Sequence, residues 1–108
     1  MLYKFKSQAT ADLIMLQPNG RRLLEIIGKD ADQPKGILLP EAMPAAIAAL
    51  EAAIVREEAE QKHAAEQAAA RGEDPPRIDG ISLRQRAVPF IEMLRRCEKA
   101  EKEIVWGV

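Results

Sequence analysis

The sequence predicts an α+β domain in which a small sheet, built from the N- and C-terminal segments, packs on about three helices, one of them long. Two observations lead to this prediction. Residues Met1–Ser7 and Ile104–Val108 are rich in β-forming side chains. Between them runs a helical stripe of four large apolar side chains at spacings of four, three and four. These are Met43, Ile47, Leu50 and Ile54. We expect the stripe to be the inward seam onto which both ends fold.

Length and composition fit a single domain over residues 1–108. Hydrophobic residues make up 47% of the chain and charged residues 31%, and no run approaches the roughly 18 apolar residues of a membrane span. The opening MLYKFKS lacks the apolar core of a secretory signal, and a single cysteine cannot close an internal disulfide. Together these features predict a cytoplasmic protein.

The first strand is predicted over Met1–Ser7, where two aromatic side chains alternate with two lysines. The next segment has two interpretations. Ala11–Leu16 forms a short helix if Thr10 caps it, or Leu13–Leu16 forms a buried strand that makes a hairpin with the first. The strand is favoured because two strands alone make a marginal sheet.

A helix is predicted from Pro18 to Ile27, because proline suits the first turn of a helix and Gly28 suits the position after its last turn. A polar loop over Lys29–Lys35 follows. The apolar segment Gly36–Leu39 is then expected to lie buried against the core.

The long helix is predicted over Pro40–Glu58. The residue before a proline avoids the helical conformation, so Pro40–Met43 is expected to be a separate turn and the helix proper to begin at Pro44. Alanines fill most positions between the members of the seam, and alanine is the strongest helix former.

The apolar stripe fades after Val55. We therefore expect residues 57–70 to be a helix that outruns its core, either solvated and fraying or supported by a second copy of the chain. Arg71–Gly80 reads as a loop because it holds two glycines and adjacent prolines. Together, residues 57–80 are predicted to be a variable and mobile extension.

Ser82 and Gln85 match a capping box, which begins a helix that runs to about Ala100. Pro89 lies inside this helix and removes one backbone hydrogen bond, so we expect a kink or a restart there. A short strand over Ile104–Val108 closes the chain and is expected to pair with the first strand. The apolar stripe of this last helix contains Leu83, Ala87, Phe90 or Ile91, and Leu94.

Five stretches carry a resemblance to a known family. They are MLYKFKS, DLIMLQPNGRRLLEIIGKD, ILLPEAMPAAIAALEAAI with one extra leucine, LRQRAVPFIEML and VWGV. In order and wording they resemble the small bacterial family catalogued as domain of unknown function eighteen-forty, over nearly the whole chain except about residues 56–80. The resemblance implies a short intracellular bacterial protein with no established activity, cofactor or catalytic residue.

The helix start Pro18–Arg22 is the sharpest candidate site. Free N–H groups at a helix start favour an anion, and paired arginines would help to hold it. The stretch lacks the longer glycine-rich loop and lysine of a P-loop, so the other interpretation is a tight turn with surface arginines. The candidate anion-binding residues are Asn19, Gly20, Arg21 and Arg22.

His63 is the single histidine, and Glu60 and Glu66 lie three residues to either side of it. Glu-x-x-His occurs in di-iron bundles, but those need two such motifs from facing helices, so this metal site is a weak alternative that a dimer would have to complete. We predict no cofactor and no catalytic residue. Cys97 lacks a neighbouring base and is expected to be a half-buried structural thiol, and Trp106 is expected to fill the core or a sheet edge.

Charge is distributed unevenly, because residues 41–74 carry eight acidic and three basic groups. Nucleic-acid binding is not expected, since only four aromatic residues are available for stacking. A basic series on the last helix is expected to be solvated, or to dock on an acidic surface such as Glu57–Glu66 of another subunit. Its members are Arg84, Arg86, Arg95, Arg96 and Lys99.

We expect a small non-catalytic binding or regulatory module that acts through protein–protein contact, because the sequence clusters no acid, base, nucleophile or metal set. One alternative is an anion or phosphate-ligand binder, or an enzyme, that uses Pro18–Arg22. A second alternative is a self-associating structural protein built on the long acidic helix. The partner is either an unknown protein or a second copy of the chain.

Overall fold

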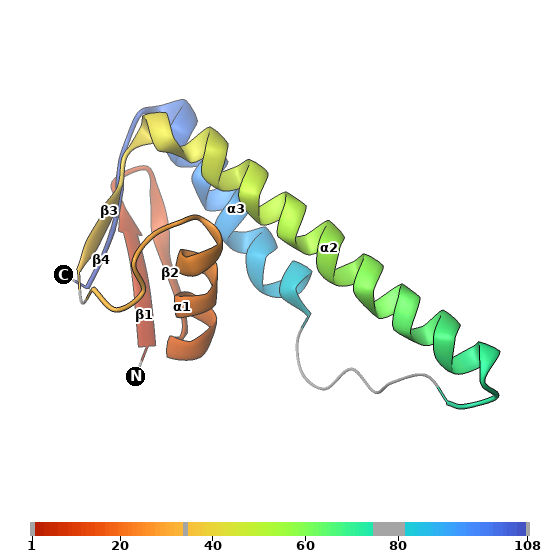
Figure 1. Ribbon diagram of the computed structural model, residues 1–108. Helices are drawn as coiled ribbons and strands as arrows, with labels where there is room; N and C mark the ends of the chain where they lie inside the picture. The colour runs from red at the N-terminus through yellow and green to blue at the C-terminus, as the bar shows by residue number, and fades with distance from the viewer. Residues whose placement is uncertain (1, 34, 75–81, 108) are drawn as a thin grey trace.

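The computed structural model describes residues 2–33, 35–74 and 82–107. Within these ranges a four-stranded antiparallel sheet, in the order β2-β1-β4-β3, lies on one side of the molecule and three helices lie on the other (Figure 1). The predicted α+β class is confirmed, and the first and last strands pair as expected. In chain order the elements are β1 (Leu2–Ser7), β2 (Thr10–Leu16), α1 (Gln17–Ile26), β3 (Gly36–Leu38), a 3-10 turn (Pro40–Ala42), α2 (Met43–Ala70), α3 (Leu83–Ala100) and β4 (Ile104–Trp106).

β1 and β2 form an antiparallel hairpin, so residues 11–16 are a strand and the alternative of a short helix is wrong. Phe5 lies opposite Leu13, and Tyr3 lies opposite Met15. Directly opposite residues share a face of the sheet, and Phe5 is fully buried. All four side chains therefore point toward the helices.

The sequence did not predict β3, which pairs with β4 at one edge of the sheet. Leu38 is buried, but Ile37 and Leu39 are each 46% exposed, so the expected burial of the whole segment is wrong. The physical reason is that successive side chains of a strand point to opposite faces, and only one face of this sheet carries helices.

α1 begins at Gln17, one residue before the predicted start, with Pro18 in its first turn. Gly28 follows the helix with a φ of 83°, the left-handed conformation that glycine adopts without strain. Leu23 and Leu24 are buried beneath the helix. The predicted limits of this helix are therefore confirmed to within about one residue.

A 3-10 turn precedes α2, which confirms the predicted separate turn and places the helix start at Met43. Three members of the predicted seam are buried, and Ile47 is half-buried against the same core. The buried members are Met43, Leu50 and Ile54. The seam therefore faces the core, as expected.

The capping box at the start of α3 is confirmed: the Ser82 hydroxyl accepts a hydrogen bond from the Gln85 N–H, and the Gln85 side chain accepts one from the Ser82 N–H. α3 continues without a break through Pro89, so the predicted restart does not occur. The helix ends at Ala100 and is followed by Glu101, which adopts a left-handed conformation with a φ of 57°.

Aromatic side chains from three elements meet in the core. The ring of Phe5 lies 4.8 Å from that of Phe90 and 5.8 Å from that of Trp106, measured between ring centroids. Trp106 is buried, as expected for a residue that fills the core. Cys97 is fully buried beside the same core, deeper than the half-buried position predicted for it.

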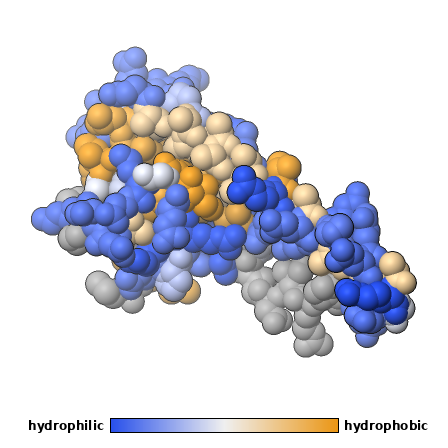
Figure 2. All heavy atoms as spheres, viewed as in Figure 1, coloured by the Kyte–Doolittle hydropathy of each residue, from blue (hydrophilic) through white to orange (hydrophobic). Residues whose placement is uncertain are grey.

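α2 is 28 residues long and extends well beyond the first turn of α3 (Figure 1). The molecule measures 52 × 28 × 22 Å and has a radius of gyration of 16.0 Å. A compact chain of this length would have a radius of gyration of about 13 Å. In Figure 2 polar residues cover most of the projecting end of α2, whereas apolar residues gather over the body of the molecule.

The predicted extension over residues 57–80 is helical up to Ala70, and residues 75–80 of the predicted loop lie outside the described residues. The mobility of this extension stays a prediction. Among the helices in the described ranges, none is both long and apolar enough to cross a bilayer.

Candidate functional site

The structure places the four residues of the predicted anion site in different environments. Gly20 is buried against β1, where a Cβ would come within 2.6 Å of the Tyr3 ring. This glycine therefore permits close packing of α1 on the sheet. Arg21 donates hydrogen bonds to the Asp32 carboxylate at 2.6 Å and to the Ala31 carbonyl at 2.9 Å. The bond to Asp32 is the main cause that raises the pKa of Arg21.

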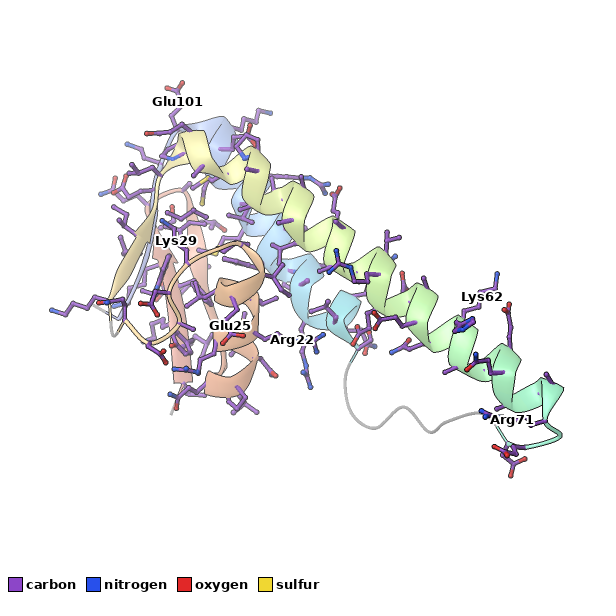
Figure 3. All side chains as sticks on the ribbon, in the orientation of Figure 1. Arg22, Glu25, Lys29, Lys62, Arg71 and Glu101 are labelled. Atoms are coloured by element: carbon purple, nitrogen blue, oxygen red, sulfur yellow. The ribbon has the colours of Figure 1, made fainter. Side chains whose placement is uncertain are left out.

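Arg22 extends from α1 toward α2 and lies 3.5 Å from the Glu57 carboxylate (Figure 3). Asn19 lines a different hollow, beside β2. The structure therefore does not bring the two arginines together around one anion. Consecutive residues of a helix project about 100° apart, and each arginine has an intramolecular carboxylate partner.

A hollow of about 450 Å³ does lie beside Arg21. Its lining includes Tyr3, Lys4, Gln17, Arg21 and Asp32. Arg21 brings a cationic side chain to this hollow and Lys4 also belongs to its lining, but Asp32 supplies a carboxylate as well. The surroundings are therefore only weakly selective for an anion.

The weak metal alternative falls on the projecting part of α2, where Glu60, His63 and Glu66 are all exposed. No group of three or more metal-ligating side chains is assembled within the described residues. Figure 3 shows Lys62 on the same stretch, far from the sheet.

Part of the predicted basic series pairs with α2 of the same chain. Arg84 lies 2.6 Å from Glu58, and Arg95 lies 2.6 Å from Glu51. Glu57 also accepts a hydrogen bond from the Leu83 N–H at 3.0 Å. The acidic surface of α2 and the basic surface of α3 are thus complementary within one molecule, and they do not need another subunit to meet.

Within the described residues, one face of the sheet is not covered by a helix (Figure 1). The register places Leu2 opposite Leu16 and Lys4 opposite Ile14 on this face, and Ile37 opposite Val105 farther across it. We call this surface the open face. It consists of Leu2, Lys4, Lys6, Asp12, Ile14, Leu16, Ile37 and Val105.

Three residues of the open face form a cluster that we call the apolar corner, at the end of β1 and β2. Leu2 is 65% exposed, Leu16 is 61% exposed and Ile14 is 51% exposed. The solvated face of an antiparallel sheet is ordinarily polar, so the expected side chains here would be hydrophilic. Adjacent large apolar side chains on a surface are typical of a contact for another molecule.

A small groove of about 170 Å³ runs beside β2, and we call it the β2 groove. Three consecutive strand residues line it, although their side chains alternate between the two faces of the sheet. The groove therefore flanks the free edge of β2. Its lining includes Leu13, Ile14 and Met15 of β2, Asn19 of α1, and Arg86 and Pro89 of α3.

Arg86 differs from Arg84 and Arg95 of the same helix. Its Nε atom is buried and has no hydrogen-bond partner among the described residues. In the same ranges its guanidinium makes no ion pair within 4.0 Å, whereas Arg84 and Arg95 each have a carboxylate. A buried donor without an acceptor is unfavourable. A hydrogen-bond acceptor of a ligand would therefore contribute most to the free energy of binding beside Arg86.

Sequence reasoning missed both surfaces. One signal was present for the open face, because Leu2 lies two residues before Lys4 and shares its side of the strand. No signal distinguished Arg86 from its basic neighbours, since its isolation depends on how α3 meets β2.

A family model described as "Domain of unknown function (DUF1840)" matches residues 1–106. This match confirms the resemblance seen in the sequence. No curated protein and no solved structure gives a significant match to the chain. The function must therefore be argued from the surfaces themselves.

Proposed function

The chain belongs to the family described as Domain of unknown function (DUF1840), and from that starting point we propose that it is a non-catalytic module that binds a partner protein through the open face of its sheet. The observation that supports this proposal is the apolar corner. Leu2, Ile14 and Leu16 lie side by side there with more than half of each side chain in water.

Burial of these side chains against a partner would be favourable at roughly 25 cal/mol per Å² of apolar surface. Lys4 lies opposite Ile14, and Lys6 lies two residues farther along β1. A partner with apolar side chains and acidic groups would match this mixture of apolar and cationic surface. The lysines also disfavour cationic partners, which adds selectivity.

A photo-crosslinking amino acid at position 16, introduced into the full chain in its native cells, tests this proposal. We expect one reproducible crosslinked protein, and we expect the adduct to disappear when Leu2→Ser is added. The matched control carries the crosslinker at Val55, which is 64% exposed but lies on α2 away from the sheet. Equal labelling at both positions, or no labelling at position 16, would contradict the proposal.

A second candidate is an anion or phosphate-ligand binder, favoured by the hollow beside Arg21 that also includes Lys4. Titration of inorganic phosphate into the wild-type protein and into Asp32→Asn, followed by amide NMR shifts, tests it. We expect shifts at Gly20 and Arg21 that grow when the competing carboxylate is removed. Unchanged spectra for both proteins would eliminate this candidate.

A third candidate is self-association through α2, favoured by the length of helix that extends beyond α3. Light scattering over a range of protein concentrations separates it from the first two. A mass that stays monomeric at the highest concentration would rule it out.

A further inference from the structure

We infer that the free edge of β2 accepts an extended segment of the partner protein as a fifth strand, and that an acidic side chain of that segment pairs with Arg86. This inference rests on the proposed function and specifies the chemistry of the partner. Its components are an unprotected strand edge, a groove beside that edge, and an arginine without a carboxylate.

β2 is the longest strand and lies at the edge of the sheet, where it pairs with β1 alone. Proteins ordinarily protect such an edge with lysine, proline, a bulge or a very short strand. β2 spans seven residues and contains neither lysine nor proline, and Asp12 is its single charged residue. Its pairing with β1 has one register shift, at Ala11–Asp12, and is regular over Leu13–Leu16, so the regular stretch is the one available to another strand. The opposite edge, β3, is only three residues long. The row of backbone donors and acceptors on the outer side of β2 is therefore the better template for another strand.

The β2 groove lies where side chains of an added strand would fall. Neighbouring strands are about 4.8 Å apart, and directly opposite residues share a face. Residues of the added strand that lie opposite Leu13 and Met15 would point inward, into the part of the groove that Arg86 lines. Residues opposite Ile14 and Leu16 would point outward and extend the apolar corner.

Arg86 determines the chemistry of the inward position. Its partly buried guanidinium has lost part of its hydration without gaining a carboxylate among the described residues. A carboxylate can accept two parallel hydrogen bonds from a guanidinium, which is stronger and more specific than a neutral contact. The segment that fits is therefore extended, with an inward Glu or Asp between outward aliphatic residues.

A second copy of β2 does not fit this description. Antiparallel pairing of two β2 strands would place both Arg86 guanidiniums on the same side of the junction, where they would repel each other. In the regular part of β2 the inward residues are Leu13 and Met15, which offer no carboxylate. Asp12 lies on the outward register and cannot reach across the strand.

A displayed library of random nine-residue peptides, selected against the full-length protein, tests the inference. We expect enriched sequences to carry one acidic residue flanked by alternating aliphatic residues. A synthetic version of the most enriched peptide should slow hydrogen exchange at the β2 amides. Arg86→Gln should weaken its binding roughly tenfold or more, and a Glu→Gln or Asp→Asn exchange in the peptide should cause a similar, non-additive loss.

Arg96→Gln is the matched control, because Arg96 is an exposed arginine on the same helix and should leave binding unchanged. Peptides without an acidic preference, or binding that ignores Arg86 and leaves β2 exchange unchanged, would overturn the inference. If these peptides no longer bind the Leu2→Ser and Leu16→Ser variants, binding at the open face is still supported and only the strand-addition mode is contradicted. If no peptide is enriched, strand addition is overturned. The crosslinking experiment at position 16 then decides the open-face function separately.

Discussion

Gly36 lies directly opposite Trp106 in the sheet, and the absence of a side chain there leaves room for the indole. A Cβ at this position would lie 2.2 Å from a ring carbon, closer than any van der Waals contact allows. Either the ring or the strand would have to move, and Trp106 is enclosed by the core on its other sides. This single position therefore limits how closely β3 and β4 can pack.

Gly36→Ala is expected to lower the free energy of unfolding by about 1–3 kcal/mol, the usual cost of overpacking a core. Urea denaturation followed by fluorescence of Trp106, the single tryptophan, measures this change. Gly72→Asn is the control, because nothing lies near a Cβ there and asparagine tolerates the positive φ of 71°. If Gly36→Ala were as stable as wild type, the Trp106 ring could move aside without cost, and the predicted clash would be wrong.

Gly20 shows why residue roles are hard to predict from a sequence. A glycine followed by two arginines at a helix start suggests an anion site. In the fold, Gly20 packs against Tyr3, and Arg21 and Arg22 pair with separate carboxylates. Those partners are remote in the sequence, so spacing within one segment could not reveal them.

At the scale of elements, α2 and α3 are held together by an apolar seam with ion pairs along its border. Leu50 is fully buried in the seam, whereas Val55 lies beyond it and is largely exposed. The two residues belong to one helix and differ by a single methylene. Alanine substitutions at these two positions therefore compare the loss of a buried side chain with the loss of an exposed one in the same helix.

Leu50→Ala is expected to lower the free energy of unfolding by about 2–5 kcal/mol, because it removes buried methyl groups and leaves a cavity. Val55→Ala should change it by less than about 0.5 kcal/mol. Urea denaturation of both variants provides the comparison. Similar losses for the two would mean that the seam is not the face on which the helix packs.

The Glu58–Arg84 pair predicts a pH dependence. The hydrogen bond from Arg84 lowers the pKa of Glu58 below its ordinary value of 4.5. A carboxylate with a lowered folded-state pKa stabilises the fold above its ordinary pKa, and this contribution is lost as the pH falls through the lowered value.

We therefore expect wild type to exceed Glu58→Gln in thermal stability at pH 7, and the difference to close as the pH falls below 4.5. High salt should reduce the difference at pH 7, because both side chains are exposed to solvent. Glu60→Gln is the control, because it removes an exposed acidic side chain of the same helix that makes no ion pair within 4.0 Å among the described residues. A difference between wild type and Glu58→Gln that does not vary with pH would contradict the role of the ion pair.

Most elements could be predicted from local patterns, because their causes are local. The capping residues of α3 and the prolines around the start of α2 set helix limits without help from the rest of the chain. β3 could not be predicted, since three residues give no alternation to read and its strand character depends on β4. The β2 groove was also hidden, because it forms only where three separate elements meet.

The whole molecule consists of a packed body and a helical projection. The last large buried side chain of α2 is Ile54, and the later positions of the helix are mostly exposed, with Ala68 as the single buried exception. The projecting half is therefore held mainly by its own helical hydrogen bonds and by alanine propensity, not by a core.

Amide hydrogen exchange should show this division directly. Residues 44–56 are expected to exchange at rates close to those of α3, whereas residues 60–70 should exchange much faster, because their hydrogen bonds open without disruption of the core. Mass spectrometry of short peptides along α2 measures the gradient, with α3 as the internal reference. Uniform protection along α2 would mean that another molecule covers the projection.

β4 lies between β1 and β3, so it alone links these two strands within the sheet. Residues 104–106 also emerge from the ribosome after all the other described strands and helices. Until they appear, β3 has no neighbour to pair with, and the pocket lined by Phe5 and Phe90 lacks its indole. The sheet therefore cannot be completed before β4 is synthesised, although β1, β2 and β3 precede it in the chain.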